Sequence, residues 1–471
     1  MKLGALLHSD DTSDVSGFVI DHRKVAQGSV FGAFVGVRFN GEDFIADAVR
    51  AGAVAVVARP QAQVIGAHHI ASDEPRRRFA LLAAQFYAPY PETIVAVTGT
   101  NGKTSTVELT RQLWRMAGHH AASIGTLGVT TSDEAVATGL TSPDIATFLS
   151  NMAGLQREGV THVAYEASSH GLHQYRAEGL PVKAAAFTNL SRDHLDYHGD
   201  MPSYLTAKLR LFSEVVAPDG TAVVHLGDEY ADRVVDLARA RGLKLVTIGA
   251  MGQTLKLTKR TPTALGQTLE ILVDGKIYTV ALPLIGAYQA ENALTAAALV
   301  IATGGDVPTT LANLARLQPV RGRLERACVT RRGAAVYIDY AHTPDALFAA
   351  LGALRPHAKG KLIVAFGAGG DRDVGKRPLM GEAAAHGADV VIVTDDNPRS
   401  ETPAHIRAAI VAKAPSAIEI GDRRTAIATA IAMAEANDIV LIAGKGHETG
   451  QYVGDQILPF DDVQVARECA A

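Results

Sequence analysis

Residues Gly99 to Thr104, within the run VTGTNGKT, have the types and spacing of a phosphate-binding loop. A glycine-rich turn between a strand and a helix directs several backbone N–H groups at one point, where the helix dipole favours negative charge. Lys103 adds a cation for the β- and γ-phosphates, and Thr104 offers a hydroxyl to Mg²⁺. The strict pattern G-x-x-x-x-G-K-[ST] is not met, because Val97 occupies the place of its first glycine. Against the alternative of a chance glycine-rich turn, we predict a nucleoside triphosphate site on a shortened loop.

Two further candidates lie where apolar runs end. Glu166 closes the strand-like run THVAYE, and His194 lies in NLSRDHLDYHGD, a run dense in Asp, Asn and His. Taken alone, Glu166 is equally suited to capping a helix, and the run around His194 is typical of a solvated loop. Beside a phosphate loop, Glu166 becomes a candidate ligand of Mg²⁺, which prefers hard oxygen atoms. Zinc is not expected, since the chain has neither H-E-x-x-H nor a cysteine pair.

The last third of the chain carries more charged groups at strand ends. Arg323 in VRGRLE and Asp339 in DYAHTPD suit either a structural ion pair or contacts to nucleotide phosphates. In DDNPR, an Asn-Pro turn accounts for Asn397 and Pro398 but leaves Arg399 unexplained. A planar guanidinium suits bidentate binding of a carboxylate. The segment AGKGHETG offers glycines, a lysine and an acid, which suit an anion or an amine.

Alternating apolar strands and helices position these groups. We expect an α/β fold of three domains: an N-terminal α/β domain at 1–87, a central ATPase-type domain with a mainly parallel sheet at 88–318, and a Rossmann-like doubly wound domain at 319–471. APYPE marks the first linker and PVRGR the second. Ligands of such sheets bind beyond the carboxyl ends of the strands, where the polar clusters fall.

Composition narrows the class of protein further. The chain has 471 residues, 47% of them hydrophobic, and a net charge of −4, so nothing indicates binding to nucleic acid or an anionic membrane. Cys328 and Cys469 are the only cysteines and lie far apart, which argues against a disulfide scaffold and fits a reducing compartment. The first residues lack a signal-peptide core, and no run approaches the roughly 20 apolar residues of a membrane span. We therefore expect a cytoplasmic protein.

Taken together, the motifs resemble the Mur ligase family. From one end of the chain to the other they are DHRKVAQGSVFGAFVG, TGTNGKT, YEASSHGL, TNLSRDHLDYHGD, AENALTAA, GRLE, DYAHTPD, GGDRD followed by GKRP, DNPR and GKGHE, in family order. The shortened phosphate loop is the form that this family uses. Within the family, DNPR is the signature of members that add meso-diaminopimelate.

The resemblance implies a reaction. ATP phosphorylates a carboxylate of UDP-MurNAc-L-Ala-D-Glu, the amine of meso-diaminopimelate attacks the acyl phosphate, and phosphate leaves as the amide forms, a step of peptidoglycan precursor synthesis. The protein then mainly positions reactants and neutralises charge. The same reaction with L-lysine is the alternative within the class, and a P-loop ATPase switch is the alternative outside it. Folylpolyglutamate synthetase shares the short loop but explains neither the N-terminal block nor DNPR.

The resemblance also implies site residues. Gly99, Thr100, Asn101, Gly102, Lys103 and Thr104 hold the triphosphate, and Asn292, Arg323, Asp339 and His342 add ATP contacts. The implied catalytic residues are Lys103, Glu166, His194 and Lys208, and the implied Mg²⁺ residues are Thr104, Glu166, His194 and Lys208. Lys208 matches a lysine that the family carbamylates. The implied contacts to diaminopimelate are Arg372, Asp396, Asn397, Pro398, Arg399, Gly444 and Glu448.

The UDP-linked substrate is implied to lie on Ile20, His22, Thr141, Ser142, Ser168, Gln174 and Arg176. At the uridine contacts the chain departs from the family, which commonly has D-S-R where this chain has Asp21-His22-Arg23. The family motif therefore supports the uridine contacts less than it supports the other implied site residues. The implied partners are small-molecule substrates, and we expect a monomer with Mg²⁺ as its cofactor.

Overall fold

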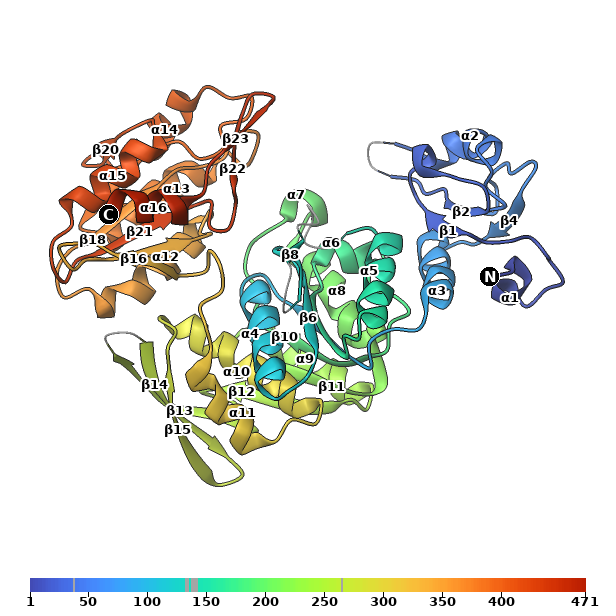
Figure 1. The fold of residues 1–471 in the computed structure, drawn as a ribbon, viewed down its shortest axis with the longest axis horizontal. Helices are drawn as coiled ribbons and strands as arrows, with labels where there is room; N and C mark the ends of the chain where they lie inside the picture. The colour runs from blue at the N-terminus through green and yellow to red at the C-terminus, as the bar shows by residue number, and fades with distance from the viewer. Residues whose placement is uncertain (37–38, 132–134, 137–142, 264–265) are drawn as a thin grey trace. The chain divides into compact units, whose positions relative to one another are not determined.

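A computed structural model describes residues 1–36, 39–131, 135–136, 143–263 and 266–471 (Figure 1). The predicted substrate contacts Thr141 and Ser142 lie outside the described residues. The chain forms two compact units, of which the first comprises Met1–Lys256 and Leu294–Thr310 and the second Leu257–Ala293 and Leu311–Ala471. The division into three domains at 1–87, 88–318 and 319–471, expected from the linkers, stays a prediction. Within the described ranges, no helix is long and apolar enough to cross a membrane.

The N-terminal segment folds around a parallel sheet of order β1-β2-β3-β4. The apolar runs SVFGAFVG and AVAVVA contain β2 and β3, and the segment EDFIADAVRAG forms most of η2 and then α2. Helix α3 begins with a proline, whose fixed φ suits a first helical turn. The elements are α1 (Leu3–Leu7), β1 (Gly17–Val19), η1 (His22–Lys24), β2 (Ser29–Gly32), η2 (Gly41–Phe44), α2 (Ile45–Arg50), β3 (Ala55–Ala58), β4 (His68–Ala71) and α3 (Pro75–Tyr87).

Eleven strands of the described chain form the central sheet, in the order β15-β14-β13-β12-β11-β10-β5-β9-β6-β7-β8. In this sheet order, each strand from β13 through β12, β11, β10, β5 and β9 to β6 pairs in parallel with the next. At one edge β7 is antiparallel to both β6 and β8, and at the other edge β14 is antiparallel to β15. Strands β5 and β9 are buried along their whole length, as parallel strands covered on both faces must be. The strands are β5 (Thr93–Thr98), β6 (Ala121–Gly125), β7 (Gly128–Thr130), β8 (Ala135–Val136), β9 (His162–Glu166), β10 (Val182–Phe187), β11 (Val216–His225), β12 (Lys244–Gly249), β13 (Leu255–Thr263), β14 (Gly266–Val273) and β15 (Lys276–Leu282).

Helices follow most of these strands, as expected. One apolar core joins the N-terminal segment to the first part of the central sheet, because Phe18 and Phe79 share it with Ile94 and Phe187. The helices are α4 (Lys103–Met116), α5 (Ile145–Arg157), α6 (Ser169–His173), α7 (Leu195–His198), α8 (Met201–Arg210), the π-helical η3 (Leu211–Val215), α9 (Ala231–Ala240), α10 (Ala287–Ala302), α11 (Val307–Asn313) and η4 (Leu314–Arg316).

The C-terminal segment contains a six-stranded sheet of order β16-β17-β21-β18-β19-β20, counted over the described residues. Strand β16 is antiparallel and the others are parallel. Separate apolar cores on its two faces, one with α12 to α14 and one with α15 and α16, confirm the doubly wound prediction. The elements are β16 (Glu325–Val329), β17 (Ala335–Asp339), α12 (Pro344–Leu354), η5 (Arg355–His357), β18 (Leu362–Phe366), α13 (Lys376–Gly387), β19 (Val390–Val393), α14 (Pro403–Val411), β20 (Ile418–Glu419), α15 (Arg423–Met433), β21 (Ile439–Ala443), β22 (Gly450–Val453), β23 (Gln456–Pro459) and α16 (Asp462–Ala470).

Candidate active site

The predicted phosphate loop connects β5 to α4, as its sequence indicated. Gly102 precedes α4 with φ 87°, and Gly99 has φ 145°, a conformation that residues with a side chain rarely adopt. A methyl group on Gly99 would overlap Thr188 Oγ1 and lie 3.0 Å from the Asn189 carbonyl oxygen. The loop backbone therefore passes too close to its neighbours for any residue but glycine at position 99.

The segment after β10 braces this loop. Thr188 Oγ1 donates to the Asn101 carbonyl at 2.6 Å, and Asn189 Oδ1 accepts from the Asn101 N–H at 2.9 Å. The Asn189 carbonyl accepts from the Thr100 N–H at 2.8 Å, and Thr100 Oγ1 accepts from the Ser191 N–H at 2.9 Å. These contacts join residues about ninety positions apart and hold the loop in shape. Sequence reasoning placed TNLS at a strand end but did not connect Thr188, Asn189 or Ser191 with the phosphate loop.

Two lysines converge on one carbonyl of the loop. Lys103 Nζ donates to the carbonyl oxygens of Gly99 at 3.0 Å and Thr100 at 2.8 Å. Lys208, from α8, donates to the same Gly99 oxygen at 2.7 Å and lies 4.4 Å from the centre of the Tyr204 ring. Lys208 is 1% exposed, and its burial, together with the charge of Lys103, holds its pKa well below the ordinary value. A neutral amine is the form of lysine that adds CO₂, so this environment suits the carbamylation that the resemblance implied.

Glu166 ends β9 with a buried carboxylate. It accepts from the Thr126 N–H at 2.7 Å and from Thr126 Oγ1 at 3.2 Å, and a methyl group on Gly125 would overlap it. The helix-cap alternative is wrong, because Ser168 caps α6 by accepting from the Gly171 N–H at 3.0 Å. A specific cradle for a buried carboxylate fits a role in ligand or cation binding.

The oxygen ligands near the phosphate loop suit Mg²⁺ when substrate phosphates complete its coordination. Within the described ranges no three His, Cys, Asp or Glu side chains are arranged to hold a metal ion. Mg²⁺ is commonly bound by one or two carboxylates together with substrate phosphates and water rather than by a protein cage. The Glu166 carboxylate and the Thr104 hydroxyl, buried at the start of α4, are donors of that kind.

His194 lies just before α7 in a left-handed conformation, with φ 53°. Its side chain is about half exposed, and Nε2 lies 3.4 Å from Asp193 Oδ2. The ring is edge-on to His170, at 4.9 Å between centroids, and to Tyr204, at 6.2 Å. Since Tyr204 packs on Lys208, the structure brings His194 to the neighbourhood of the phosphate loop.

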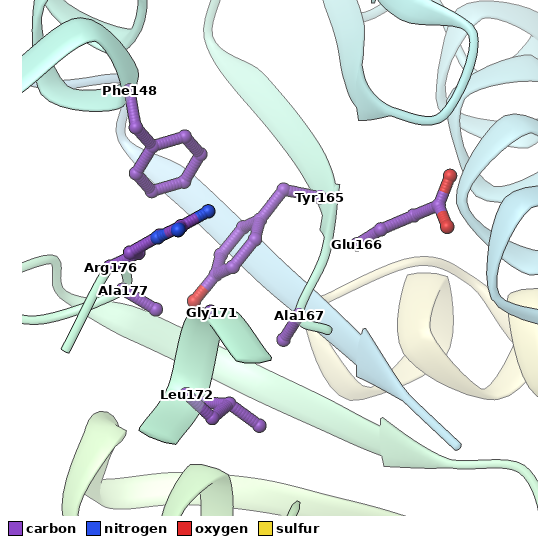
Figure 2. Close-up of a pocket in the computed structure, with 8 residues that line it drawn as sticks. All are labelled: Phe148, Tyr165, Glu166, Ala167, Gly171, Leu172, Arg176 and Ala177. Atoms are coloured by element: carbon purple, nitrogen blue, oxygen red, sulfur yellow. The ribbon is translucent and has the colours of Figure 1, made fainter. Parts of the chain in front are cut away.

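Three of the predicted substrate contacts lie together on α6 and the turn after it. Gln174 donates to Tyr197 Oη at 2.9 Å and accepts from Arg176 Nη2 at 2.6 Å, while Ser168 caps α6. Figure 2 shows the Arg176 guanidinium beside the Phe148 and Tyr165 rings, with Glu166 directed away from them. A pocket here is lined by Phe148, Tyr165, Glu166, Ala167, Gly171, Leu172, Arg176 and Ala177. Burial lowers the pKa of Arg176.

The predicted uridine contacts Ile20 and His22 lie in a partly exposed segment after β1. Ile20 follows β1 and is 38% exposed. The His22 ring stacks on Phe44, with centroids 4.2 Å apart and an interplanar angle of 1°. Asp21 and Arg23, on either side of His22, pair with each other at 2.8 Å. The Asp-His-Arg triplet thus forms a local turn with one partly exposed ring stack.

The remaining predicted ATP contacts lie in the second unit. Asn292, buried in α10, donates to Gln289 Oε1 at 3.1 Å, and Gln289 donates to the Arg323 carbonyl at 3.1 Å. The Arg323 guanidinium lies 4.6 Å from the centre of the Tyr340 ring. The structure therefore connects Asn292 to Arg323 through a single glutamine.

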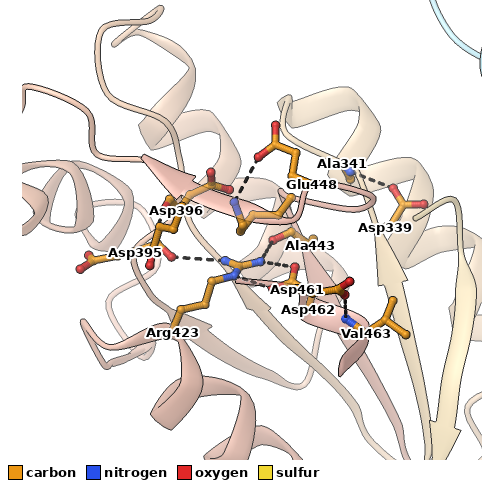
Figure 3. Close-up of polar contacts among 12 residues, drawn as sticks. Asp339, Ala341, Asp395, Asp396, Arg423, Ala443, Glu448, Asp461, Asp462 and Val463 are labelled. Atoms are coloured by element: carbon orange, nitrogen blue, oxygen red, sulfur yellow. Dashed lines mark hydrogen bonds and ion pairs between the residues drawn. The ribbon is translucent and has the colours of Figure 1, made fainter. Parts of the chain in front are cut away.

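Asp339 ends β17 and is buried. Its two oxygens accept from the N–H groups of Leu324, at 2.7 Å, and Ala341, at 2.8 Å, the latter drawn in Figure 3. Burial raises its pKa to about 6, against the opposing effect of Arg323 and these hydrogen bonds. His342, two residues on from Tyr340, is exposed, and its Nδ1 lies 2.8 Å from the Tyr340 carbonyl.

The segments DNPR and GKGHE meet at the ends of β19 and β21. Asn397 donates to Glu448 Oε2 at 2.8 Å, and Lys445 Nζ lies 3.1 Å from both Asn397 Oδ1 and Glu448 Oε2. Lys445 is fully buried. Sequence reasoning noted a lysine in this segment but did not include it among the site residues. A methyl group on Gly444, at φ 114°, would overlap Asp396 Oδ2, so the two segments touch through this glycine.

Arg399 and Arg372 flank this network. Arg399 has φ 54°, and its Nη1 donates to the Gly370 carbonyl at 2.7 Å, while its backbone N–H donates to the Tyr452 carbonyl at 3.0 Å. The Glu401 N–H donates to the Pro398 carbonyl at 3.1 Å, so a turn follows Pro398, but Asn397 is also buried in a polar network, which a simple turn does not require. Arg372 is exposed on the loop after β18.

A buried ion pair contacts the backbone at the ends of β19 and β21. Arg423, at the start of α15, pairs with Asp462 of α16 at 2.7 Å, and both side chains are 0% exposed. Arg423 also donates to the carbonyl oxygens of Ala443, at 3.0 Å, and Asp395, at 3.3 Å (Figure 3). These two residues directly precede Gly444 and Asp396.

Comparison with known proteins identifies similar chains along the whole length. Residues 97–300 match the Mur ligase middle domain, and residues 322–446 match the Mur ligase glutamate ligase domain. The chain is 58% identical, over 96% of its length and 94% of the relative, to UDP-N-acetylmuramoyl-L-alanyl-D-glutamate--2,6-diaminopimelate ligase of Zymomonas mobilis. It is 51% identical to the protein of that name from Bradyrhizobium diazoefficiens, over 98% and 97% of the two chains. A solved structure of that name superposes with a TM-score of 0.75 at 32% identity, covering 100% of this chain and 98% of the other.

Proposed function

Because the chain belongs to the Mur ligase family, we propose that it joins meso-diaminopimelate to UDP-MurNAc-L-Ala-D-Glu at the expense of ATP, in peptidoglycan precursor synthesis. The observation that carries the choice of amino acid is the buried network of Asn397, Lys445 and Glu448 with Arg399 at its edge. It provides the Glu448 carboxylate for an amine and the Arg399 guanidinium for a carboxylate, and meso-diaminopimelate differs from lysine by such a second carboxylate.

The reaction has two covalent steps. An oxygen of the substrate carboxylate attacks the γ-phosphorus of ATP, the bond to ADP breaks, and an acyl phosphate forms. The amine nitrogen then attacks the acyl carbon, a proton is lost, and the carbon–oxygen bond to phosphate breaks to leave the amide. Phosphorylation is needed because a carboxylate oxygen is otherwise a poor leaving group.

The chain contributes mainly position and charge to these steps. The Thr100 and Asn101 N–H groups bond to Asn189, and the loop so held presents the N-terminus of α4 to the triphosphate. Lys103 exchanges its two loop carbonyls for phosphate oxygens. Thr104, Glu166, His194 and carbamylated Lys208 are the proposed Mg²⁺ residues. Bound Mg²⁺ would neutralise charge on the phosphates and the transferred group. The carbamate would give Lys208 a negative group in place of a cation that burial disfavours.

The binding assignments for the other substrates follow the same reasoning. Arg323, Asn292, Asp339 and His342 are proposed ATP residues, and Ser168, Gln174 and Arg176 are proposed contacts of the UDP-linked peptide. Arg372, Asp396, Asn397, Pro398, Arg399, Gly444 and Glu448 are proposed to bind diaminopimelate. We also propose a monomer that acts in the cytoplasm with Mg²⁺.

One product analysis tests the proposal. Purified protein is incubated with ATP, Mg²⁺ and UDP-MurNAc-L-Ala-D-Glu, with meso-diaminopimelate or L-lysine offered separately, and the products are identified by mass. We expect the diaminopimelate tripeptide product and phosphate release that requires both acceptor and amino acid. A lysine product at equal or greater rate would contradict the proposed specificity, and rapid phosphate release from ATP alone would favour an ATPase switch.

A further inference from the structure

Lys445 is a fully buried lysine between two glycines of the GKGHE segment. Its side chain is 0% exposed, although lysines are rarely buried completely unless their charge is paired. Gly444 and Gly446 have φ of 114° and 55°, so the backbone on both sides of Lys445 adopts a conformation that favours glycine. A methyl group on Gly446 would lie 2.7 Å from Tyr340 Cβ. The segment thus combines a specialised backbone with a buried cation.

All three N–H groups of the Lys445 ammonium have an acceptor. Nζ donates to Asn397 Oδ1 at 3.1 Å, to Glu448 Oε2 at 3.1 Å and to the Gly450 carbonyl at 2.5 Å. These acceptors belong to the segment after β19, the turn after β21 and the start of β22. Since an ammonium has three donors and no acceptor, none is left for a substrate. Lys445 therefore acts on a ligand only through the groups that it holds.

The Asn397 amide is fixed in one orientation by its neighbours. Its Oδ1 accepts from Lys445 and also from the Tyr452 N–H, at 3.0 Å. Its Nδ2 donates to Glu448 Oε2 at 2.8 Å. A lysine offers only donors and a carboxylate only acceptors, so the reversed amide would lose both contacts. The ammonium of Lys445 thereby helps to direct the amide N–H of Asn397 at Glu448.

The same contacts determine which oxygen of Glu448 is left for a ligand. Both Asn397 and Lys445 donate to Oε2. Within the part of the chain that the structure describes, neither of these donors is bonded to Oε1. The Glu448 side chain is 27% exposed, whereas that of Lys445 is fully buried. The carboxylate therefore has one oxygen held inside the protein and one available to a ligand.

We propose that Lys445 is a positioning residue of the diaminopimelate site, which holds Glu448 Oε2 and Asn397 Oδ1 so that Glu448 Oε1 meets an amine of diaminopimelate. This inference rests on the proposed function, in which the Glu448 carboxylate binds that amine. A carboxylate that two donors hold in place before the ligand arrives loses less conformational freedom on binding. Without Lys445, one of the two donors to Oε2 is lost, and Asn397 keeps only the Tyr452 N–H on its Oδ1.

The test compares two lysine variants of the full chain. Lys445→Met keeps an unbranched side chain and removes all three donors, and Lys413→Met makes the same change at an exposed position just after α14. We expect Lys445→Met to raise the KM for meso-diaminopimelate about tenfold or more, the loss typical of one hydrogen bond to a charged group. The KM values for ATP and UDP-MurNAc-L-Ala-D-Glu should stay unchanged, and kcat at saturating meso-diaminopimelate should change less than the KM. Lys413→Met should behave like the protein without substitutions.

A double-mutant cycle with Glu448→Gln separates positioning from general support of the fold. Glu448→Gln removes the charge that binds the amine, so Lys445 no longer has a carboxylate to position. We expect Lys445→Met to raise the KM for meso-diaminopimelate by a much smaller factor in this background than in the protein without substitutions. Equal factors in the two backgrounds, or an unchanged KM in Lys445→Met, would overturn the inference, whatever the change in melting temperature.

A second variant keeps the experiment decisive if Lys445→Met does not fold. Lys445→Gln keeps two N–H donors at a shorter reach and removes the charge. We expect it to raise the KM for meso-diaminopimelate, and to do so by a smaller factor beside Glu448→Gln. A normal KM, or the same factor in both backgrounds, would again contradict the positioning role.

The same experiments distinguish this inference from the proposed function. If the protein without substitutions forms the diaminopimelate product but Lys445→Met has the same KM as Lys413→Met, the inference alone is wrong. If product forms only with L-lysine, the proposed amino acid is wrong, and the cycle repeated with L-lysine still decides whether Lys445 acts through Glu448. If neither amino acid gives a product and calorimetry detects no binding of meso-diaminopimelate, the proposed function and the inference are both wrong.

Discussion

Replacing Gly99 by alanine is the sharpest test of the phosphate loop. The backbone there has φ 145°, which costs a residue with a side chain about 1–3 kcal/mol. The new methyl group also overlaps Thr188 Oγ1, so Thr188 must turn away and lose its 2.6 Å hydrogen bond to the Asn101 carbonyl. Such a hydrogen bond contributes about 1 kcal/mol. We expect Gly99→Ala to lower the free energy of unfolding by roughly 2–4 kcal/mol.

The same change should damage the site as well as the fold. Since the displaced threonine braces Asn101, the loop N–H groups lose their common direction, and the KM for ATP should rise at least tenfold, a change worth about 1.4 kcal/mol. Gly159→Ala is a matched control, because Gly159 also has a positive φ, 81°, but its methyl group would meet open space. That control should cost about 1 kcal/mol and leave the KM for ATP unchanged.

A double-mutant cycle measures the proposed contact directly. Thr188→Ala removes the atom that the methyl group strikes, so Gly99→Ala should be less damaging in that background than in the unmodified protein. Coupling of about 1 kcal/mol or more in the free energy of unfolding is expected for residues in contact. Strictly additive effects, or a Gly99→Ala protein with normal stability and a normal KM for ATP, would refute the reasoning.

Three further predictions concern the charged groups. Arg399→Ala should weaken the binding of diaminopimelate by about 2–5 kcal/mol, measured as a rise in its KM. An unchanged KM would contradict the proposed role of Arg399. Lys208→Ala should lose activity that more substrate does not restore. Labelled CO₂ should give a carbamate signal in the protein without substitutions and none in this variant. Burial raises the pKa of Asp339 from 3.8 to about 6, so the folded state holds the proton more tightly than the unfolded chain. Its contribution therefore favours folding increasingly as the pH falls from about 6 towards 4, by about 3 kcal/mol at most, and Asp339→Asn should remove that part of the pH dependence of unfolding.

Local features of the site could be predicted from the sequence. The strand, turn and helix around Gly99 are neighbours in the chain, and both the apolar run and the glycines that identify them are local signals. Glu166 was found in the same way, because it ends a buried strand. The antiparallel pair β14–β15 was not expected, although the alternating burial of β14 and the Asp274-Gly275 turn between the two strands are a local hairpin signal.

Contacts between distant segments could not be predicted. Thr188 and Asn189 brace the phosphate loop because β10 lies beside β5 in the sheet, and strand order is not written in the pattern of either strand. Lys445 is a similar case. Its burial depends on Asn397, which reaches it only because β19 and β21 are both neighbours of β18.

The ion pair of Arg423 with Asp462 has a practical consequence for handling the protein. Helix α16 lies beyond GKGHE, the last of the motifs in the chain. Through Arg423, however, it anchors the carbonyls that directly precede Asp396 and Gly444, two of the residues proposed to bind diaminopimelate. A tag added after Ala471 leaves this anchor in place, whereas a truncation before Asp462 leaves a buried guanidinium without its carboxylate. Helix α16 is therefore expected to support the proposed diaminopimelate site although none of its own residues is proposed to contact the ligand.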